Sequence, residues 1–453
     1  MWIDHWVAAC LVPLAFWILL SGLDDLFIDL VYWLMGKKQP GSPAGAELDG
    51  VSERRIAILV PLWREDRVIA PMLRRNLSTL RYANYDVFVG VYPNDEGTAA
   101  AVAGVARDHP SVHMAVCPHD GPTSKGDCLN HAYAAMRERE HAHGVRYRVV
   151  VTHDAEDLIH PDSLRLINWF SRRYQMVQVP VLPLPTAARE FTHGVYCDEF
   201  AEYQSKDIPV RRRLGGFLPS NGVGTGYARP ALERLARERQ GRPFDPECLT
   251  EDYETGYRLH ALGFSQVFVP VRFDASGPVA TREYFPRNFR AAIRQRGRWV
   301  AGIALQGWER HGWRTSWRQR YWFWRDRKGL MGNLLSPLAN VLFLYGLASC
   351  LAAAGNGAVW HLGTCIPHWL RWTSGSTLVL SALQTGVRVA TSARTYGLRF
   401  AAAAPLRMPW ANIVNCAATL EGLRQFFGAR SRRGALVWIK TEHIYPAQTG
   451  ETG

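Results

Sequence analysis

The sequence predicts an α/β domain that lies between apolar, membrane-spanning regions. From Arg54 to about Asp274, short runs rich in β-branched residues alternate with helical stretches, and this alternation is typical of a mostly parallel sheet covered by helices. On both sides of this region, apolar stretches without formal charge are long enough to cross a bilayer. The composition agrees, because 21% charged residues and a mean hydropathy of −0.14 fit a globular protein with an apolar part attached.

The first apolar stretch, His5–Leu23, predicts a membrane anchor. No basic region precedes it, so a cleaved signal peptide is not expected. Lys37 and Lys38 follow the apolar region and predict that the next domain is cytoplasmic. Three acids interrupt the apolar continuation: Asp24, Asp25 and Asp29. They are expected at a membrane interface or against another helix.

The α/β region is expected to contain at least four strands. Their predicted ranges are Ile56–Leu62, Tyr85–Tyr92, Tyr147–Asp154 and Met176–Pro183. A helix is expected from Asp66 to Leu80, between the first two strands. Ligands of such sheets gather at the carboxyl ends of the strands, so the residues that follow each strand are the candidates for a site.

Further apolar helices are expected after the α/β region. Gly329–Gly355 predicts a second spanning helix, and Ser374–Thr391 a weaker third that contains Gln384 and Arg388. The stretch Pro409–Phe427 fits either an amphipathic or a re-entrant helix, and the sequence leaves both open. Arginines near the C-terminus predict a cytoplasmic tail.

Basic residues concentrate in one segment. Between Thr281 and Leu330 there are 13 Arg or Lys, 3 acids and six Trp. This mixture suits nucleic acid or a helix on an anionic membrane surface. The segment adjoins a spanning helix, so the membrane is favoured and no nucleic-acid partner is expected. Eight scattered Cys without a CxxC pair argue against a disulfide framework or a structural zinc site.

Polar residues follow the predicted strands. The third strand runs into HDAED, where carboxylates two apart could hold Mg²⁺ or Mn²⁺ together with substrate phosphates. The alternative is an acidic cap for the helix near Pro161, and the sequence alone does not decide. Asp95 ends the second strand and could hydrogen-bond a nucleoside. Lys125 begins a helix, where it could reach a phosphate or base, or remain a solvated surface lysine.

The glycine-rich run GVGTG, residues 222–226, is not a dinucleotide fingerprint. It lies in the middle of the domain, without the first-strand context that such a fingerprint needs. NAD is therefore not expected. Glycines also open the backbone for close approach of a ligand, so Gly224 and Thr225 are candidates for contact with a substrate.

The stretch LTEDYETGY begins a helix. Thr250 can cap it, Glu251 and Asp252 suit the positive end of its dipole, and Gly263 is a stop signal. Alone, the stretch favours capping over a substrate proton acceptor. About forty residues later, RQRGRW offers planar Arg forks for a diphosphate and a Trp ring for a sugar, or forms an interfacial basic helix.

The motifs VPLWRE, YPND, SKGDCLN, DAED, TED and QRGRW occur in this order. Together they resemble the motif series of processive family-2 glycosyltransferases, the class of cellulose and hyaluronan synthases. Longer stretches, such as SGLDDLFIDLVYW, WRDRKG and WIKTEHIYP, extend the resemblance over nearly the whole chain, toward inner-membrane members linked to phage adsorption and exopolysaccharide. The resemblance implies a cytoplasmic GT-A domain, which is a Rossmann-like nucleotide-diphospho-sugar transferase fold, flanked by transmembrane helices.

The resemblance also assigns roles to residues. Asp252 is implied to be the general base, with Glu251 beside it as a second catalytic candidate. The implied metal set, for Mg²⁺ or Mn²⁺, is Asp154, Glu156 and Asp157. The family has Asp-x-Asp there, so whether Glu156 or Asp157 is the second ligand stays open. The residues implied to hold the donor and the acceptor end of the glycan are Pro61, Glu65, Asp95, Lys125, Gln295, Arg296, Arg298 and Trp299.

The implied activity is inverting transfer from a nucleotide-diphosphate sugar, a UDP-hexose or UDP-N-acetylhexosamine, to build an exopolysaccharide or surface glycan at the bacterial inner membrane. The implied partners are a glycan or lipid-linked acceptor and a periplasmic or outer-membrane export protein. Two alternatives are an enzyme that transfers one sugar to a lipid phosphate, and a membrane receptor or scaffold with a decayed site. Relatives can carry a C-terminal cyclic-di-GMP-binding domain, for which a chain ending at Gly453 leaves no room.

The expected organisation has six parts: an anchor at 1–36, a linker at 37–53, a GT-A domain at 54–280, basic Trp-rich interfacial helices at 281–328, transmembrane or interfacial helices at 329–427 and a cytoplasmic tail at 428–453.

Overall fold

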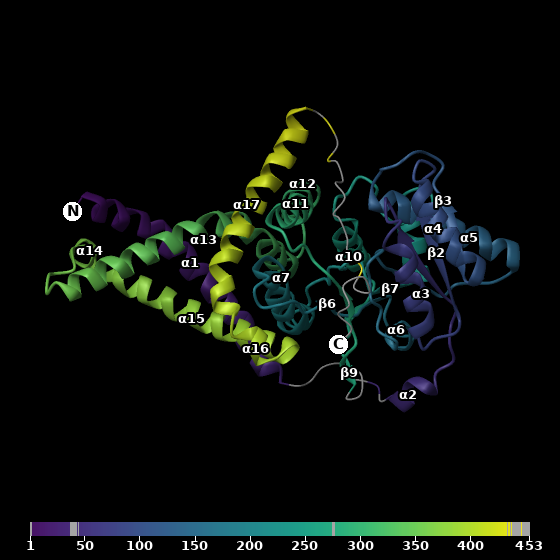
Figure 1. Ribbon diagram of the computed structural model, residues 1–453, viewed down its shortest axis with the longest axis horizontal. Coiled ribbons are helices and arrows are strands. Elements are labelled where there is room, and N and C mark those ends of the chain that lie inside the picture. The colour runs from purple at the N-terminus through teal and green to yellow at the C-terminus, as the bar shows by residue number, and fades with distance from the viewer. Residues whose placement is uncertain are drawn as a thin grey trace.

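The computed structural model describes residues 2–36, 43, 45–273, 277–432, 434, 436 and 445. Residues 37–42 and 44 of the expected linker, which include Lys37 and Lys38, and most of the expected tail beyond residue 432 lie outside the described residues. An α/β region forms one part of the molecule and a group of long helices forms the other (Figure 1).

A mixed sheet of seven strands, in the order β3-β2-β1-β4-β7-β5-β8, is the centre of the α/β region. The strands are β1 (Ile56–Pro61), β2 (Tyr85–Val91), β3 (Val112–Val116), β4 (Val149–Thr152), β5 (Met176–Gln178), β7 (Thr225–Ala228) and β8 (Gln266–Phe268). Only β7 among them runs antiparallel to its neighbours. The expected mostly parallel sheet is thereby confirmed.

The expected strand Met176–Pro183 is divided into two. After β5 the chain leaves the sheet, and β6 (Val181–Pro183) pairs instead with β11 (Thr281–Glu283). Pro180 lies at the division, and proline has no N–H for a sheet interior. This departure brings β11 beside the chain that follows β4, since Leu158 exchanges backbone hydrogen bonds with Arg282.

Helices cover both faces of the sheet. They are α3 (Ile69–Thr79), α4 (Glu96–Asp108), α5 (Lys125–His143), α6 (Ser163–Phe170), α9 (Arg229–Glu238) and α10 (Glu251–Ala261). Along β1, Ile58 packs in one core with α3, α4 and α6, whereas Leu59 packs in the opposite core with α5, α9 and α10. Because both faces are buried, β1 is continuously apolar rather than alternating.

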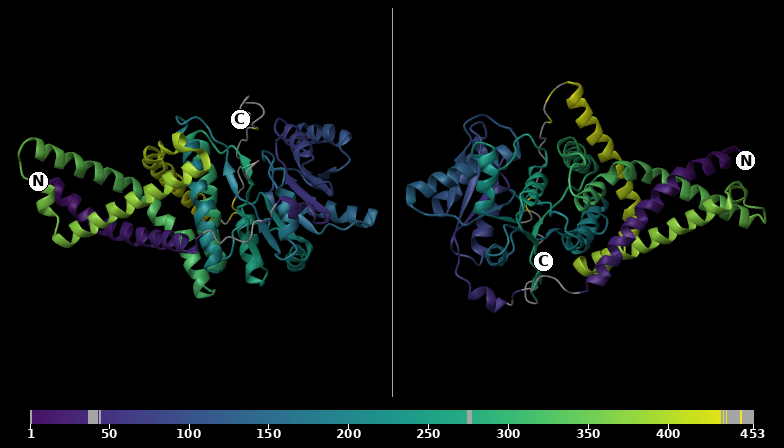
Figure 2. Two further views of the ribbon diagram at one scale, coloured as in Figure 1. Left: turned by 90° about the horizontal axis from the view of Figure 1, so that it is seen from below. Right: turned by 180° about the vertical axis from the view of Figure 1, so that it is seen from behind.

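A second group of helices lies between the sheet and the long helices. It consists of α7 (Phe191–Glu202), the π-helical segment η1 (Tyr203–Asp207), α8 (Ile208–Arg213), α11 (Phe289–Trp299), the π-helical segment η2 (Val300–Gln306) and α12 (Gly307–His311). The remaining helices are α1 (Trp2–Met35), α13 (Trp317–Gly355), α14 (His361–Cys365), α15 (His368–Tyr396), α16 (Leu398–Ala401) and α17 (Ala404–Ser431), with a short α2 (Gly45–Asp49) before the sheet. Figure 2 shows α1, α13 and α15 extending away from the α/β region.

Two of the described helices, α1 and α13, are long and apolar enough to cross a membrane. No residue in the most apolar window of α13 is buried, and the residues of this helix from 329 to 355 are partly buried or exposed. The weaker span expected at Ser374–Thr391 lies within α15, which does not meet the same measure. Its Gln384 and Arg388 contact acids of other helices, at Asp25 and Glu202.

The three acids in the second half of α1, Asp24, Asp25 and Asp29, join it to the rest of the protein. Lys328 on α13 donates to Asp24 at 2.8 Å and to Asp25 at 2.7 Å. Lys206 on η1 donates to Asp29 at 2.5 Å. The expectation that these acids lie against another helix is confirmed, and the contacts tie the apolar helices to the segment that borders the cavity described next.

Candidate active site

The carboxyl ends of β1, β2 and β4 open into a cavity of about 480 Å³. These strands are parallel neighbours, so the residues that follow them meet at one edge of the sheet. The first residues of α5 and α10 and one side of α11 complete the walls. Toward the long helices, the cavity reaches Tyr203 of η1 and Arg388 of α15.

Most residues singled out from the sequence line this cavity. They are Pro61, Glu65, Lys125, Asp154, Glu156, Glu251, Asp252, Gln295, Arg298 and Trp299. These residues come from the ends of two strands, β1 and β4, and from the starts or faces of three helices, α5, α10 and α11.

Five other predicted residues lie behind the cavity wall. Asp95 caps α4 and accepts a hydrogen bond from the Arg64 backbone N–H at 2.5 Å. Arg296 donates to Glu199 at 2.6 Å and to Asn415 at 2.7 Å. Both are positioned to hold wall segments in place, Asp95 through the loop after β1 and Arg296 through α7 and α17.

Asp157 is also behind the wall. Its Oδ2 lies 2.6 Å from His153 Nδ1 and accepts from the Asp154 backbone N–H at 3.0 Å. The carboxylate is fully buried, and burial raises its pKa while His153 acts to lower it. The side chain therefore fixes the turn that presents Asp154 to the cavity.

The last two predicted residues, Gly224 and Thr225, face the sheet. Thr225 is completely buried and donates to Gln178 at 2.6 Å. A Cβ on Gly224 would lie 2.4 Å from Thr281 Oγ1. The contact of this glycine run with a substrate stays a prediction. Gly222, at the start of the run, has a φ of +76°.

Gly222 leaves space for the side chains of Asp252 and Lys125. A Cβ built on it would lie 2.8 Å from Asp252 Oδ2 and 3.2 Å from Lys125 Nζ. Its positive φ is the region that glycine adopts without steric cost. The backbone of Gly222 therefore packs directly against the Asp252 carboxyl group and the Lys125 ammonium group.

The start of α10 carries Glu251, which is buried, and Asp252, which is partly buried. Thr250 is the N-cap residue, but its side chain makes no capping hydrogen bond, which corrects the sequence interpretation. Its Oγ1 is packed against Gly302 of η2, where an added Cβ would lie 2.6 Å away. Thr250 thus fixes the distance between α10 and η2. The helix ends before Gly263, at φ +81°, as expected.

Lys125 is the positive centre of the site. Its Nζ lies 2.6 Å from Asp154 Oδ1. Burial acts to lower the pKa of Lys125, but Asp154, Glu251 and Asp252 outweigh it and raise that pKa above its ordinary value. The amine stays charged because three carboxyl groups surround it.

The cavity-lining acids of α10, Glu251 and Asp252, bind protons more tightly than exposed acids. Burial and the neighbouring Asp252 raise the pKa of Glu251 to about 8, against the opposing effect of Lys125. Burial also raises the pKa of Asp252, while Lys125 acts to lower it. A buried carboxylate with a raised pKa is suited to accept a proton near neutral pH.

The carboxyl groups beside Lys125 form an oxygen-rich set. Asp154 and Glu156 line the cavity together with Glu283 of β11. Burial, followed by the negative charges of Asp157 and Asp154, raises the pKa of Glu283 well above its usual range. Hard divalent cations such as Mg²⁺ and Mn²⁺ prefer such oxygen ligands, so the residues fit a divalent ion.

The opposite wall offers one hydrogen-bond donor and one acceptor to a ligand. Arg298 Nε and Gln295 Oε1 are buried, and neither has a hydrogen-bond partner among the described residues. Buried polar groups usually have a partner, which a ligand in the cavity would supply. Trp299 is only partly buried and its ring packs at 6.1 Å and 80° to that of Tyr196, so its other side borders the cavity.

Sequence reasoning missed several lining residues. They are Glu199, Tyr203, Asp207, Glu283, Asp326 and Arg388. One signal was available: Glu283 and Asp326 are two of only three acids in the basic segment. Asp326 accepts from Arg211 at 2.7 Å and from the Tyr253 hydroxyl at 2.6 Å, which no local pattern indicates.

Residues 54–302 match the model of the family described as glycosyltransferase like family 2. The chain belongs to this family. It is an enzyme of the glycosyltransferase class with a GT-A-like α/β fold and flanking apolar helices. The match covers the seven-stranded sheet, α11 and most of the cavity lining, but not Ile303, Asp326 and Arg388.

Relatives and solved structures agree with this assignment. The chain is 37% identical, over 469 aligned residues, to bacteriophage adsorption protein B of Escherichia coli K12 and to bacteriophage N4 adsorption protein B of Escherichia coli O157:H7. The alignments cover 97% of this chain and 62% of each relative, so the chain spans less than two thirds of their length. A mannosyltransferase of Pyrobaculum calidifontis, solved with GDP-Man and Mn²⁺, has the same fold, with a TM-score of 0.56, 17% identity and coverage of 93% and 99%.

We predict that Gly222→Ala lowers glycosyl transfer by about 10²-fold, because the methyl group would displace Asp252 and Lys125 and small displacements of reacting groups have effects of this size. Gly263→Ala is the matched control, since Gly263 also has a positive φ but nothing within 4 Å of an added Cβ. Donor turnover should stay near the wild-type rate in the control. Equal losses in both variants would mean that backbone strain, not the contact with the site, is responsible.

We predict that Glu251→Gln stabilises the protein increasingly as the pH rises from 5 to 8. The folded-state pKa of Glu251, about 8, lies above its unfolded value, so its proton stabilises the fold at low pH and this contribution is lost as the pH rises. Glutamine does not titrate. Between pH 5 and pH 8, the unfolding free energy of the variant relative to the wild type should increase by at least about 1 kcal/mol. The measurement is the Tm of both proteins at each pH, in the presence of EDTA.

The exposed Glu247 provides the control for this pH series. The difference in Tm between Glu247→Gln and the wild type should be the same at every pH. If Glu251→Gln also shows a constant offset, Glu251 does not have a raised pKa in the folded protein.

Proposed function

We propose that this protein transfers sugar from a nucleotide-diphosphate donor to a growing glycan at the cytoplasmic face of the bacterial inner membrane, with inversion at the anomeric carbon. The observation that carries the proposal is the single cavity that holds Asp252, the Lys125–Asp154 pair and the Arg298–Trp299 wall. One wall suits a proton acceptor and the other a diphosphate and a sugar ring.

In this proposal, Asp252 accepts the proton of the acceptor hydroxyl as that oxygen attacks the anomeric carbon. The bond from this carbon to the diphosphate breaks in the same displacement, so no covalent intermediate with the enzyme forms. Arg298 and Lys125 supply positive charge beside the departing diphosphate. The ring of Trp299 stacks on the acceptor sugar and orients its hydroxyl.

Asp154 and Glu156, with Glu283 as a further candidate, would hold a divalent cation here. Such an ion, when bound, neutralises charge on the diphosphate. The neighbouring fold, solved with GDP-Man and Mn²⁺, supports a nucleotide-sugar donor and this metal class. For the donor, we propose a UDP-hexose or UDP-N-acetylhexosamine.

We also propose that α1, α13 and α15 are embedded in the membrane. Large apolar side chains are exposed along all three helices, including Phe16, Leu344 and Val379, and a soluble surface rarely exposes so many together. The phage-adsorption names of the relatives support a surface glycan as the product. An export partner would then receive the glycan at the periplasmic side.

We predict that Asp252→Asn lowers nucleotide release from the donor by about 10²- to 10⁴-fold, the range of general-base catalysis. The measurement uses detergent-purified protein, a panel of UDP- and GDP-sugars, and Mn²⁺ or EDTA. Glu254→Gln on the same helix is the control, because Glu254 pairs with His311 and does not line the cavity. It should keep most of the activity.

Product length separates this function from its nearest alternative. A product with several sugars supports glycan synthesis. A product with one sugar on a lipid phosphate would instead show that the enzyme transfers a single sugar. Undiminished turnover in Asp252→Asn would contradict the assigned base.

A further inference from the structure

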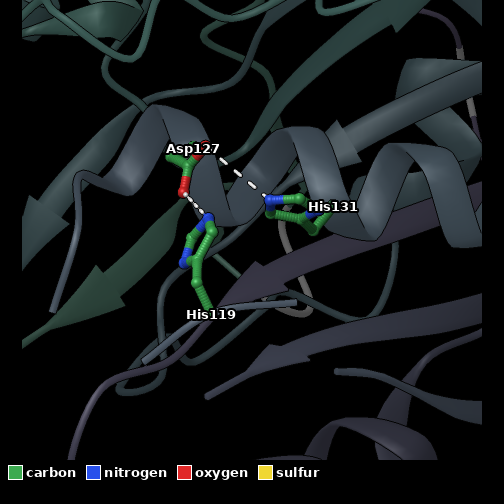
Figure 3. A group of neighbouring side chains, drawn as sticks. All are labelled: His119, Asp127 and His131. Carbon is green, nitrogen blue, oxygen red and sulfur yellow. Dashed lines mark ion pairs between the residues drawn. The ribbon is translucent and has the colours of Figure 1, made fainter. Parts of the chain in front are cut away.

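A loop and the first turns of α5 bring together a second set of side chains. His119 lies in the loop after β3, and Asp127 and His131 lie four residues apart on α5, where they share one face. Figure 3 shows both imidazole rings turned toward the Asp127 carboxylate. One ligand atom from each residue lies within 4.8 Å of the other two.

The distances in this cluster suit a shared ion better than direct hydrogen bonds. His119 Nε2 lies 3.4 Å from Asp127 Oδ2, and His131 Nε2 lies 3.7 Å from Asp127 Oδ1. Hydrogen bonds to nitrogen are shorter, at about 2.7–3.2 Å. Two ligands that each lie about 2.0–2.1 Å from a tetrahedral zinc ion are separated by about 3.3 Å.

The cluster is separate from the donor cavity and partly open. None of its three residues lines that cavity. The side chain of Asp127 is 14% exposed, that of His131 28% and that of His119 46%. Three protein ligands on one side and solvent on the other leave a position for water, as in zinc sites with three protein ligands.

We propose that His119, Asp127 and His131 bind a divalent cation of the zinc class, distinct from the oxygen-liganded cation expected at Asp154. Two imidazoles and one carboxylate favour Zn²⁺, Co²⁺ or Ni²⁺, whereas Mg²⁺ favours oxygen ligands alone. The scattered cysteines gave no sign of this site, because its ligands are His and Asp from a loop and a helix.

The site is connected to the donor cavity through Thr123. Its hydroxyl donates to Asp127 Oδ2 at 2.8 Å and lies 2.6 Å from the Tyr92 hydroxyl. Thr123 and Tyr92 both line the cavity, and Lys125 follows two residues later. Asn94 holds the same loop by two hydrogen bonds of 2.8 Å with the Gly121 backbone. A cation bound by His119 of this loop and by Asp127 and His131 of α5 would hold the loop against the helix. It would thereby restrict the movement of the cavity wall that contains Lys125.

The test measures Zn²⁺ binding to the full chain in detergent, after chelator treatment and in millimolar Mg²⁺, which occupies the oxygen-only site. Wild-type protein should bind one equivalent that the double variant His119→Ala/His131→Ala lacks. His143→Ala is the control, because His143 is an exposed histidine at the end of the same helix. Co²⁺ should give the visible absorption of a four-coordinate site in the wild type and the control only.

Two further results decide the proposal. Thr123→Val should weaken Zn²⁺ binding by about 10-fold, since it removes a hydrogen bond to a ligating carboxylate.

If the double variant does not fold, His119→Ala alone replaces it in this test, because the His119 side chain is half-exposed. Equal Zn²⁺ binding in wild type and histidine variants, or no binding in the wild type, would overturn the site. Because the readout is metal binding, it does not depend on the proposed sugar transfer.

Discussion

The ion cluster around Lys125 is the constraint on which the site depends. One ammonium group lies among Asp154, Glu251 and Asp252, all at or near the end of the central strands. Burying a charge without a partner costs several kcal/mol, so the sheet edge, the start of α5 and the start of α10 must stay in register for the fold to be stable. The same register places a proton acceptor beside the donor pocket.

Packing around the cluster is arranged to preserve this register. Gly222 leaves room for Asp252 and Lys125 to approach, and Gly302 lets η2 press against Thr250. π-Helical segments are rare and often occur at functional sites. Here η1 and η2 both border the cavity, through Tyr203 and Ile303, and η1 also contacts α1 through Lys206 and Asp29. The apolar helices are thus mechanically connected to the cavity.

Much of this arrangement could be predicted from the sequence. The strand β1, the helix starts at Lys125 and Glu251, and the grouping of Asp154, Asp252 and Trp299 follow from local patterns and ordered motifs. Glu283 could not be placed, because its position depends on β11 pairing with β6 after the chain leaves the sheet at Pro180. Arg296 does not line the cavity, because its guanidinium group is engaged by Glu199 and Asn415, and such tertiary contacts leave no local signal.

The most direct test of the account is the pH dependence of kcat/KM for the donor in Lys125→Met, compared with the wild type. Removing the positive charge should raise the pKa of Asp252, because a nearby opposite charge lowers a carboxyl pKa by about 1–3 units. The acid limb of the profile should therefore move to higher pH by about one unit or more, with activity partly regained in alkaline buffer. An acid limb at the wild-type pH would show that Lys125 does not control the ionisation of the base.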